Sequence, residues 1–146
     1  MTIDEIIAKL PKRYSIVVVD DNEDDYLLLF GKLKRIIIGD FDIAHYDFPP
    51  NFLNEYRENK LNPDIIFIDT NMPRIEGYDL CRRIRDGDDE RDGNEDVVII
   101  GMSGDKTNET KWEESGHNSF FYKKRFQRGC NCGMSVQEII DRYLTK

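Results

Sequence analysis

Apolar residues follow two alternating patterns along this chain, short unbroken runs and longer stretches with helical spacing. The short runs predict five strands, at Ser15–Val19, Phe41–Phe48, Ile65–Ile68, Val97–Met102 and Phe120–Tyr122. The stretches with helical spacing predict a helix after each strand, at Tyr26–Ile37, Phe52–Glu58, Tyr78–Arg85, Thr110–Glu114 and Val136–Leu144. The pattern therefore predicts five β-α pairs in succession.

Such a strict alternation predicts an α/β fold. Both faces of a parallel sheet are apolar, so each crossover must lay a helix against the sheet to cover them. On the first helix the residues expected to face the sheet are Tyr26, Phe30, Leu33 and Ile37. On the next two helices the inward-facing residues are expected to be Phe52 and Tyr56, and then Leu80, Cys81 and Ile84.

Two segments fall outside this pattern. Residues 1–13 form an N-terminal extension with a short amphipathic stretch, for which Thr2 is a candidate helix cap. Residues 86–96 hold seven acids against Arg91 and have almost nothing to bury, which predicts a solvated loop insertion. Their spacing does not follow the D-x-[DN]-x-[DN]-G pattern of a calcium loop. With no second domain or fixed-period repeat, residues 1–146 are expected to form one domain.

Polar residues stand where four of the predicted strands end. Asp20 and Asp21 follow the first strand, Asp69 the third and Ser103 the fourth, and Lys123 or Lys124 follows the fifth. Ligands of open parallel sheets bind outside the carboxyl ends of the strands. Three carboxylates gathered there repel one another and need a compensating cation, and Mg²⁺ is the hard ion that suits oxygen ligands and a phosphate. Taken alone, the Asp20-Asp21 pair is better explained as a helix cap or turn, but its combination with the other strand-end residues favours the cation site.

Two motifs and one serine resemble the response regulator receiver family of two-component signalling. They are V-V-V-D-D-N at Val17–Asn22, I-I-F-I-D-T-N-M-P-R-I-E-G at Ile65–Gly77, and Ser103 after Val97–Met102. The likeness covers about residues 14–146. It implies a flavodoxin-like, doubly wound (βα)5 fold with a five-stranded parallel sheet in the order 2-1-3-4-5, as in single-domain chemotaxis receivers.

The resemblance also implies a phosphoacceptor and a metal site. Asp69 matches the aspartate that takes a phosphoryl group from a sensor histidine kinase or a phosphotransfer protein. Asp21 matches the acid that binds Mg²⁺ directly, and Asp20 matches its partner, which usually acts through water. The backbone carbonyl of Asn71 would complete the protein ligands, together with Asp69.

A signalling output is implied by three further matches. Ser103 matches the hydroxyl residue that turns to meet the phosphoryl group, and Lys123 matches the lysine that pairs with it, since it lies seven residues after Gly116. Phe120 matches the aromatic residue that turns inward when Ser103 moves, although ordinary core packing explains an apolar Phe120 equally well. The changed surface would then bind a downstream protein target. Such a domain is not an enzyme, beyond catalysing its own phosphorylation and dephosphorylation.

Composition bears on which classes of molecule the chain binds and on where in the cell it is expected. The net charge of −8 over 146 residues disfavours direct binding to nucleic acid. No apolar run approaches the roughly 18 residues of a membrane span, and Asp4 and Glu5 stand where a signal peptide would be basic. A cytoplasmic protein without membrane contact is therefore expected. The cysteines are odd in number, which predicts reduced thiols, and a metal or redox role for Cys130 and Cys132 lacks a second pair.

Three features depart from the family pattern, namely Lys124, the long acidic segment 86–96 and an insertion at residues 128–134, and two rival functions remain open. Lys124 stands where the family usually has a proline after its lysine, and we expect a trans Lys123-Lys124 bond with a rebuilt segment at residues 125–133. The first rival is a receiver-like interaction module that takes no phosphate. The second is a Mg²⁺-dependent phosphatase with an aspartate nucleophile, which would need a second aspartate where Asn71 stands.

Overall fold

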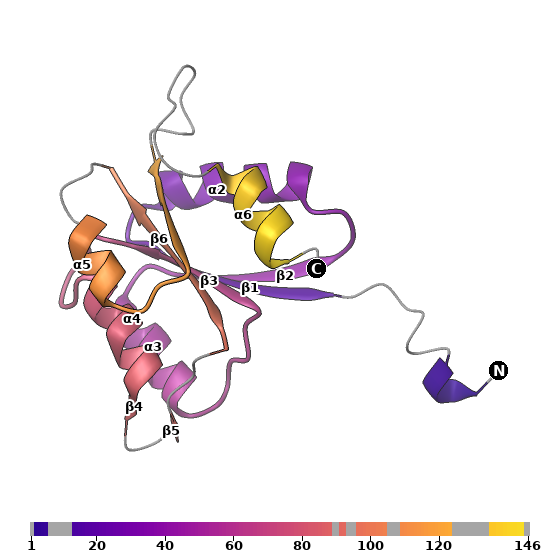
Figure 1. Cartoon of the computed structure of the whole chain (residues 1–146), viewed down its shortest axis with the longest axis horizontal. Coiled ribbons are helices and arrows are strands. Elements are labelled where there is room, and N and C mark those ends of the chain that lie inside the picture. The colour runs from indigo at the N-terminus through magenta and orange to yellow at the C-terminus, as the bar shows by residue number, and fades with distance from the viewer. Residues whose placement is uncertain are drawn as a thin grey trace.

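The computed structural model of the chain describes residues 2–5, 13–88, 91–92, 96–104, 109–123 and 135–144 (Figure 1). The predictions for Lys124, for its bond to Lys123 and for Cys130 and Cys132 lie outside these residues. Thr2 Oγ1 accepts a hydrogen bond from the Glu5 backbone N–H at 3.1 Å, so the predicted cap at the start of the chain is confirmed. Within the described parts of the chain, no helix is long and apolar enough to span a membrane.

Five parallel strands form the central sheet, in the spatial order β2-β1-β3-β6-β7. Their bounds are Tyr14–Val19 (β1), Phe41–Tyr46 (β2), Ile65–Asp69 (β3), Val98–Ser103 (β6) and Ser119–Tyr122 (β7). Counted among these five alone, the order is 2-1-3-4-5. The doubly wound, flavodoxin-like α/β fold predicted from the sequence is therefore confirmed.

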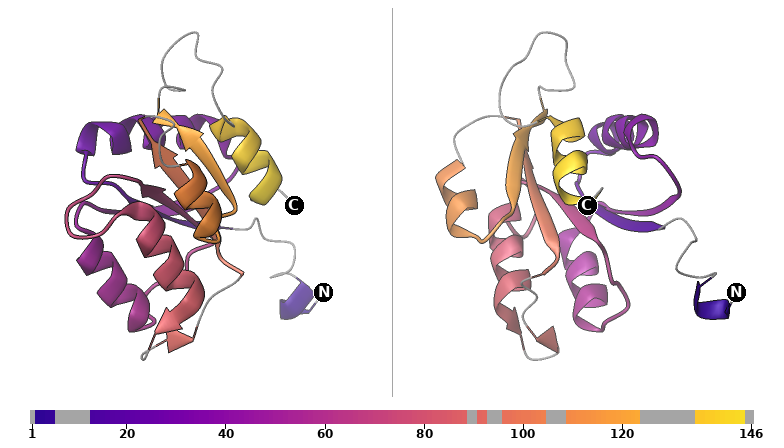
Figure 2. Two further views of the ribbon diagram at one scale, coloured as in Figure 1. Left: turned by 60° about the vertical axis from the view of Figure 1, so that its left-hand side comes forward. Right: turned by 45° about the vertical axis from the view of Figure 1, so that its right-hand side comes forward.

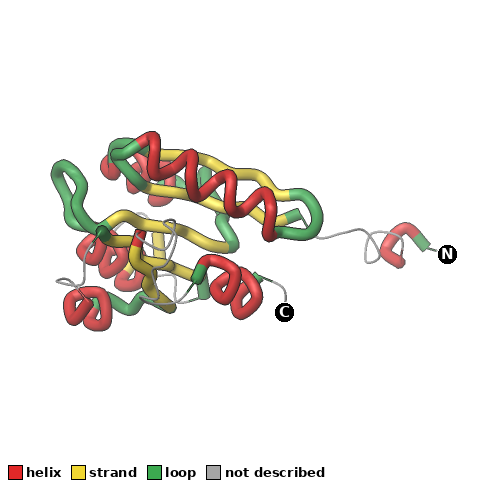
Figure 3. The backbone as a smooth tube through the Cα atoms, turned by 90° about the horizontal axis from the view of Figure 1, so that it is seen from above, coloured by secondary structure: helices red, strands yellow, loops and turns green. Residues whose placement is uncertain are grey.

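Helices cover the sheet on both faces. Their bounds are Glu23–Ile36 (α2), Pro49–Arg57 (α3), Gly77–Asp86 (α4), Glu109–Glu114 (α5) and Val136–Tyr143 (α6). Helices α2 and α6 lie on one face and helices α3, α4 and α5 on the other, as Figures 2 and 3 show from two directions. This division follows from right-handed crossovers: the step from β1 to β2 runs one way along the sheet and carries α2, whereas the later steps run the other way and carry α3, α4 and α5.

Alternation along the central strands divides the core into two apolar layers. On β1, Ile16 and Val18 point to the α2 and α6 face, whereas Val17 and Val19 point to the α3, α4 and α5 face. The expected inward residues of α3 and α4 are buried, namely Phe52 and Tyr56, and Leu80, Cys81 and Ile84. Burial of both faces explains why the central strands are continuous apolar runs.

Helix α2 begins earlier in the chain than the spacing of apolar residues predicted. The helix begins at Glu23 rather than Tyr26, because the Asn22 side chain accepts a hydrogen bond from the Asp25 N–H and caps it. Its most deeply buried residues are Leu29 and Leu33, whereas Tyr26 and Phe30 are only half-buried. Polar capping residues thus extend the helix beyond its apolar stripe and bring three acids into its first turn.

Part of the acidic segment at residues 86–96 forms a short strand pair that the prediction of a loop did not include. Gly87–Asp88 (β4) pairs antiparallel with Arg91–Asp92 (β5) directly after α4. Gly87 has a φ of 72°, a conformation that glycine adopts easily, and it ends the helix. Acidic residues and glycine have low strand propensity, so composition gave no sign of this pairing.

One close backbone contact holds the loop after β3 against α4. A Cβ atom added at Gly77 would lie 2.0 Å from the Asp69 carbonyl oxygen, and the Gly77 N–H donates to the Thr70 carbonyl at 2.8 Å. Only glycine allows helix α4 to begin this close to the end of β3. The contact fixes the backbone of Asp69 and Thr70, at and directly after the end of β3.

We therefore predict that Gly77→Ala lowers the free energy of unfolding by about 2 to 3 kcal/mol, because backbone atoms cannot move aside as a flexible side chain can. Gly31→Ala is the matched control. It adds the same methyl group inside α2 with nothing within 4 Å, and should raise stability by about 0.5 to 1 kcal/mol through helix propensity. Urea unfolding of both variants tests the pair. Equal stabilities would show that the loop after β3 accepts a Cβ without strain.

Candidate functional site

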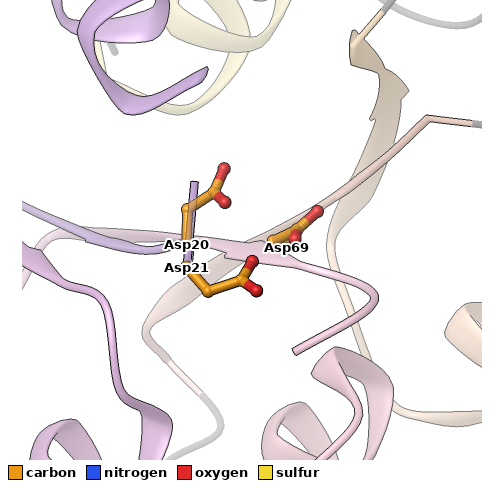
Figure 4. A group of neighbouring side chains, drawn as sticks. All are labelled: Asp20, Asp21 and Asp69. Atoms are coloured by element: carbon orange, nitrogen blue, oxygen red, sulfur yellow. The ribbon is translucent and has the colours of Figure 1, made fainter. Parts of the chain in front are cut away.

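Three carboxylates lie together at the carboxyl edge of the sheet. Asp20 and Asp21 follow β1, and Asp69 is the last residue of β3 (Figure 4). One oxygen from each lies within 4.8 Å of the other two, close enough to share one cation. Asp20 and Asp69 are buried, whereas Asp21 is exposed, so the group opens to solvent on one side.

The sheet register brings these acids together. Strands β1 and β3 are parallel neighbours and pair Val19 with Ile68, so the residues that follow each strand leave the sheet side by side. The Asp20 N–H donates to the Tyr46 carbonyl at 3.0 Å, which extends the ladder with β2 by one bond. Asp20 Oδ1 then accepts from the Asn22 N–H at 2.9 Å. These two hydrogen bonds to backbone groups hold Asp20 in place without a bound ion.

Lys123 is the cation of this group. It follows β7, and its Nζ lies 2.9 Å from Asp69 Oδ1, 3.0 Å from Asp20 Oδ2 and 2.7 Å from Asp25 Oδ2. The register of the sequence selected Lys123 over Lys124 for the position beside Asp69, and Lys123 lies there. One ammonium group therefore contacts carboxylates from three separate segments of the chain.

Burial and mutual repulsion oppose ionisation of the central acids. Burial, followed by the charge of Asp20, raises the pKa of Asp69 to about 7, although Lys123 acts in the opposite direction. Burial also raises the pKa of Asp20, against hydrogen bonds from the Asn22 backbone and from Lys123. Burial alone would lower the pKa of Lys123, but its bond to Asp25 and the charges of Asp69 and Asp20 raise it overall. The lysine is therefore firmly protonated, whereas Asp69 is balanced near neutral pH.

The remaining sequence-predicted residues surround this group at different depths. Ser103 is buried at the end of β6, one residue beyond the partner of Asp69 in the ladder. Asn71 is exposed in the loop after β3. Phe120 is half-buried on β7, and its ring lies 6.1 Å from Trp112 and 5.0 Å from Tyr122, measured between centroids. Phe120 is thus neither fully buried nor fully exposed.

Two buried residues that the sequence analysis did not single out connect this edge to helix α5. Thr70, directly after Asp69, donates from Oγ1 to the Met102 carbonyl at 2.6 Å and accepts at 2.9 Å from Trp112 Nε1. Trp112 is fully buried and also lies against Gly101, where an added Cβ would come within 2.7 Å of its ring. The only available signal was a lone tryptophan in a short predicted helix.

Asp25 was also missed. The N-cap Asn22 with an acid three residues later is a recognisable helix-start pattern, and it would have placed Asp25 in the first turn of α2. Nothing in the sequence indicates that this side chain meets a lysine 98 positions away. The contact depends on how close the start of α2 lies to the end of β7 at the carboxyl edge of the sheet.

The donor set fits a hard divalent cation. All three candidate ligands are carboxylates, which are preferred by Mg²⁺, and the exposed side of Asp21 leaves room for the water molecules that this ion retains. Among the described residues, Lys123 contacts Asp20, Asp25 and Asp69, and Asp21 lies beside two of these acids, so this group has more negative than positive charge. A cation would relieve this repulsion.

Similar proteins include regulators and sensors. The transcriptional regulatory protein YvcP of Bacillus subtilis (strain 168) is 26% identical over 110 residues, which are 75% of this chain and 42% of that protein. The sensor protein EvgS of Escherichia coli O157:H7 is 25% identical over 128 residues, which are 87% of this chain and 8% of that protein. The chain thus spans less than half the length of either relative.

Comparison with solved structures gives the same fold. The phosphorylated cyanobacterial phytochrome response regulator RcpA matches with a TM-score of 0.73 at 16% identity, over 92% of this chain and 96% of that one. The family model of the response regulator receiver domain matches residues 16–129, well over half of the chain. This protein therefore belongs to the response regulator receiver domain family of two-component signalling.

Proposed function

We propose that the chain takes up a phosphoryl group on Asp69 with the help of Mg²⁺, and signals through a changed surface. The observation that supports this most directly is the surrounding of Asp69. Its carboxylate is buried, 2.9 Å from the Lys123 ammonium, and beside the carboxylates of Asp20 and Asp21. A nucleophile, a cation for the phosphoryl oxygens and an acidic cradle for a metal ion are thus within reach of one another.

Asp21, Asp69 and the backbone carbonyl of Asn71 would hold the Mg²⁺ ion, with Asp20 acting through water. When bound, Mg²⁺ neutralises charge on the phosphoryl oxygens. Asp21 is the exposed member of the cluster, so it can exchange water for the ion without leaving a buried charge unpaired. The buried Asp20, fixed by the Asn22 N–H, would orient a water ligand rather than move toward the ion.

In the transfer itself, an ionised Asp69 oxygen attacks phosphorus and forms the new O–P bond. The P–N bond of a phosphohistidine on the donor breaks, its electron pair stays on the ring nitrogen, and a proton already on the ring or taken from solvent makes the leaving imidazole neutral. Lys123 stabilises the negative charge on the phosphoryl oxygens, which it can reach because its Nζ already contacts Asp69. The product is an acyl phosphate at the edge of the sheet.

Movements of Ser103 and Phe120 would transmit phosphorylation of Asp69 to the surface. The buried Ser103 hydroxyl lies at the carboxyl end of β6, next to the strand that carries Asp69, and would turn toward the phosphoryl oxygens. Phe120 is half-buried and would move inward as the hydroxyl leaves. Ordinary packing of Phe120 against Trp112 and Tyr122 remains the rival explanation. The surface of α5, β7 and α6 would then change.

The partners follow from this chemistry. A sensor histidine kinase or a phosphotransfer protein would supply the phosphohistidine, and a downstream protein would read the changed surface. Relatives that are a transcriptional regulatory protein and a sensor protein support a position between a kinase and an output. With a net charge of −8, the chain offers little attraction for nucleic acid of its own.

We predict that Asp69→Asn abolishes phosphorylation while the fold is kept, since the amide has the same shape but cannot act as a nucleophile. Incubation with a small phosphodonor and Mg²⁺, followed by intact mass measurement, detects the acyl phosphate. Asp24→Asn, which removes an exposed acid from α2, is the matched control and should be modified normally. A wild-type chain that takes up no phosphate would favour the interaction module, and continuous turnover of phosphomonoesters would favour the phosphatase.

A second prediction concerns the metal. Asp21→Asn should weaken Mg²⁺ binding by about tenfold or more, because one direct carboxylate ligand becomes a neutral amide. Its thermal stability in metal-free buffer should change little, because Asp21 is exposed. Calorimetric titration with MgCl₂ measures the affinity. An unchanged affinity would move the metal site away from Asp21.

The raised pKa of Asp69 leads to a third prediction. A carboxyl group with a pKa of about 7 in the metal-free protein is mostly protonated at pH 6, and Mg²⁺ must displace this proton to bind. Affinity for Mg²⁺ should therefore rise by up to about tenfold per pH unit below pH 7 and level off above pH 8. Titrations in buffers of different ionisation enthalpy count the proton released. In Asp69→Asn the pH dependence should become shallower, and an equal slope would assign the proton to another group.

A further inference from the structure

Asp25, in the first turn of helix α2, adds a fourth carboxylate to the site. Asp25 Oδ2 lies 2.7 Å from Lys123 Nζ, closer than the Asp20 oxygen at 3.0 Å or the Asp69 oxygen at 2.9 Å. Asp25 belongs to a different element from the three acids at the strand ends, and it is not among the residues whose oxygens converge on a shared cation position. It therefore contacts the lysine without being placed to bind the metal.

A role in the helix alone does not explain this contact. Acids in the first turn of a helix interact favourably with its dipole, and Glu23 and Asp24 do so equally well in the same turn. Both of those residues are exposed, whereas the Asp25 side chain is only 29% exposed and faces a lysine side chain that is 14% exposed. Such a partly buried pair between distant segments is screened less by water than a surface pair.

The carboxylates around Lys123 therefore compete for its ammonium group. An ammonium group has three N–H donors, and those of Lys123 have three carboxylate partners in Asp20, Asp25 and Asp69. A phosphoryl group on Asp69 would bring additional negative oxygens toward the same nitrogen. Asp25 would retain a share of the lysine and would add a negative charge beside the incoming anion.

We propose that Asp25 is a positioning residue that acts through Lys123, drawing the ammonium toward α2 and so setting the balance between metal binding and phosphoryl binding at Asp69. By sharing the lysine, Asp25 offsets part of the positive charge that Lys123 presents to Asp20 and Asp69, and this favours a cation beside them. By the same contact it weakens the hold of Lys123 on a phosphoryl group. The two affinities are therefore shifted in opposite directions. This inference rests on the proposed function of Asp69.

The test is to compare Asp25→Asn with wild type in two calorimetric titrations. MgCl₂ alone measures cation binding, and beryllium trifluoride in saturating Mg²⁺ measures binding of a tetrahedral phosphoryl mimic. Asp25→Asn should bind Mg²⁺ about threefold more weakly and the mimic about three- to fivefold more tightly, the size expected when one partly exposed ion-pair contact is lost. A general loss of structure would weaken both.

Two further variants separate contact from overall charge. Asp24→Asn removes the same charge from the same helix turn at an exposed position, and it should change both affinities much less than Asp25→Asn does. In a Lys123→Met background, Asp25→Asn should change Mg²⁺ affinity no more than Asp24→Asn does, because the lysine that transmits its effect is absent. An undiminished effect in that background would show that Asp25 acts directly by charge and would overturn the positioning role.

The outcomes also distinguish this inference from the proposed function. If the wild-type chain binds neither Mg²⁺ nor the mimic and takes up no phosphate, then the proposed function itself fails. If the wild-type chain binds both and is phosphorylated, but Asp25→Asn behaves as Asp24→Asn does, then only the role of Asp25 fails. A shift of both affinities in the same direction would likewise overturn the balance proposed for Asp25.

Discussion

The pairing of one lysine with carboxylates from three segments is the interaction on which the site depends. Lys123 is the shared partner of Asp20, Asp25 and Asp69, so it ties the ends of β1, β3 and β7 and the start of α2 to a single point. The two central acids are buried, and without this cation their charges would repel each other in a poorly solvated place. The lysine thus holds the carboxylates beside one another against their mutual repulsion.

The fold supplies this arrangement through its topology. Parallel strands that are neighbours in the sheet all end at the same edge, and α2 begins directly above the residues that follow β1. Two continuous apolar layers keep the strands in register, so the polar residues after them are positioned by a rigid core. The close contact between Gly77 and the Asp69 carbonyl adds a second constraint from the side of α4.

Much of this could be predicted from the sequence, and the reason is physical. Strands buried on both faces are unbroken apolar runs, so β1, β3 and β6 stand out, and the polar residues at their ends, Asp20, Asp69 and Ser103, define the site edge. The pairing of β4 with β5 was not predictable from residues of low strand propensity. Contacts such as Asp25 with Lys123, or Trp112 with Thr70, join distant segments through side-chain directions that no local pattern encodes.

The raised pKa of Asp69 connects the fold to the metal. A value of about 7 instead of 3.8 corresponds to about 4 kcal/mol against the ionised form, and this cost comes mainly from burial. Attack on phosphorus needs the ionised form, yet exposing Asp69 to water would separate it from Lys123 and from the buried Ser103. A cation bound by Asp21 and Asp69 would resolve this conflict, because it stabilises the carboxylate without exposing it. The protein alone therefore holds Asp69 near the midpoint of its titration at neutral pH, and under the proposed function its readiness for phosphoryl transfer would depend on the metal.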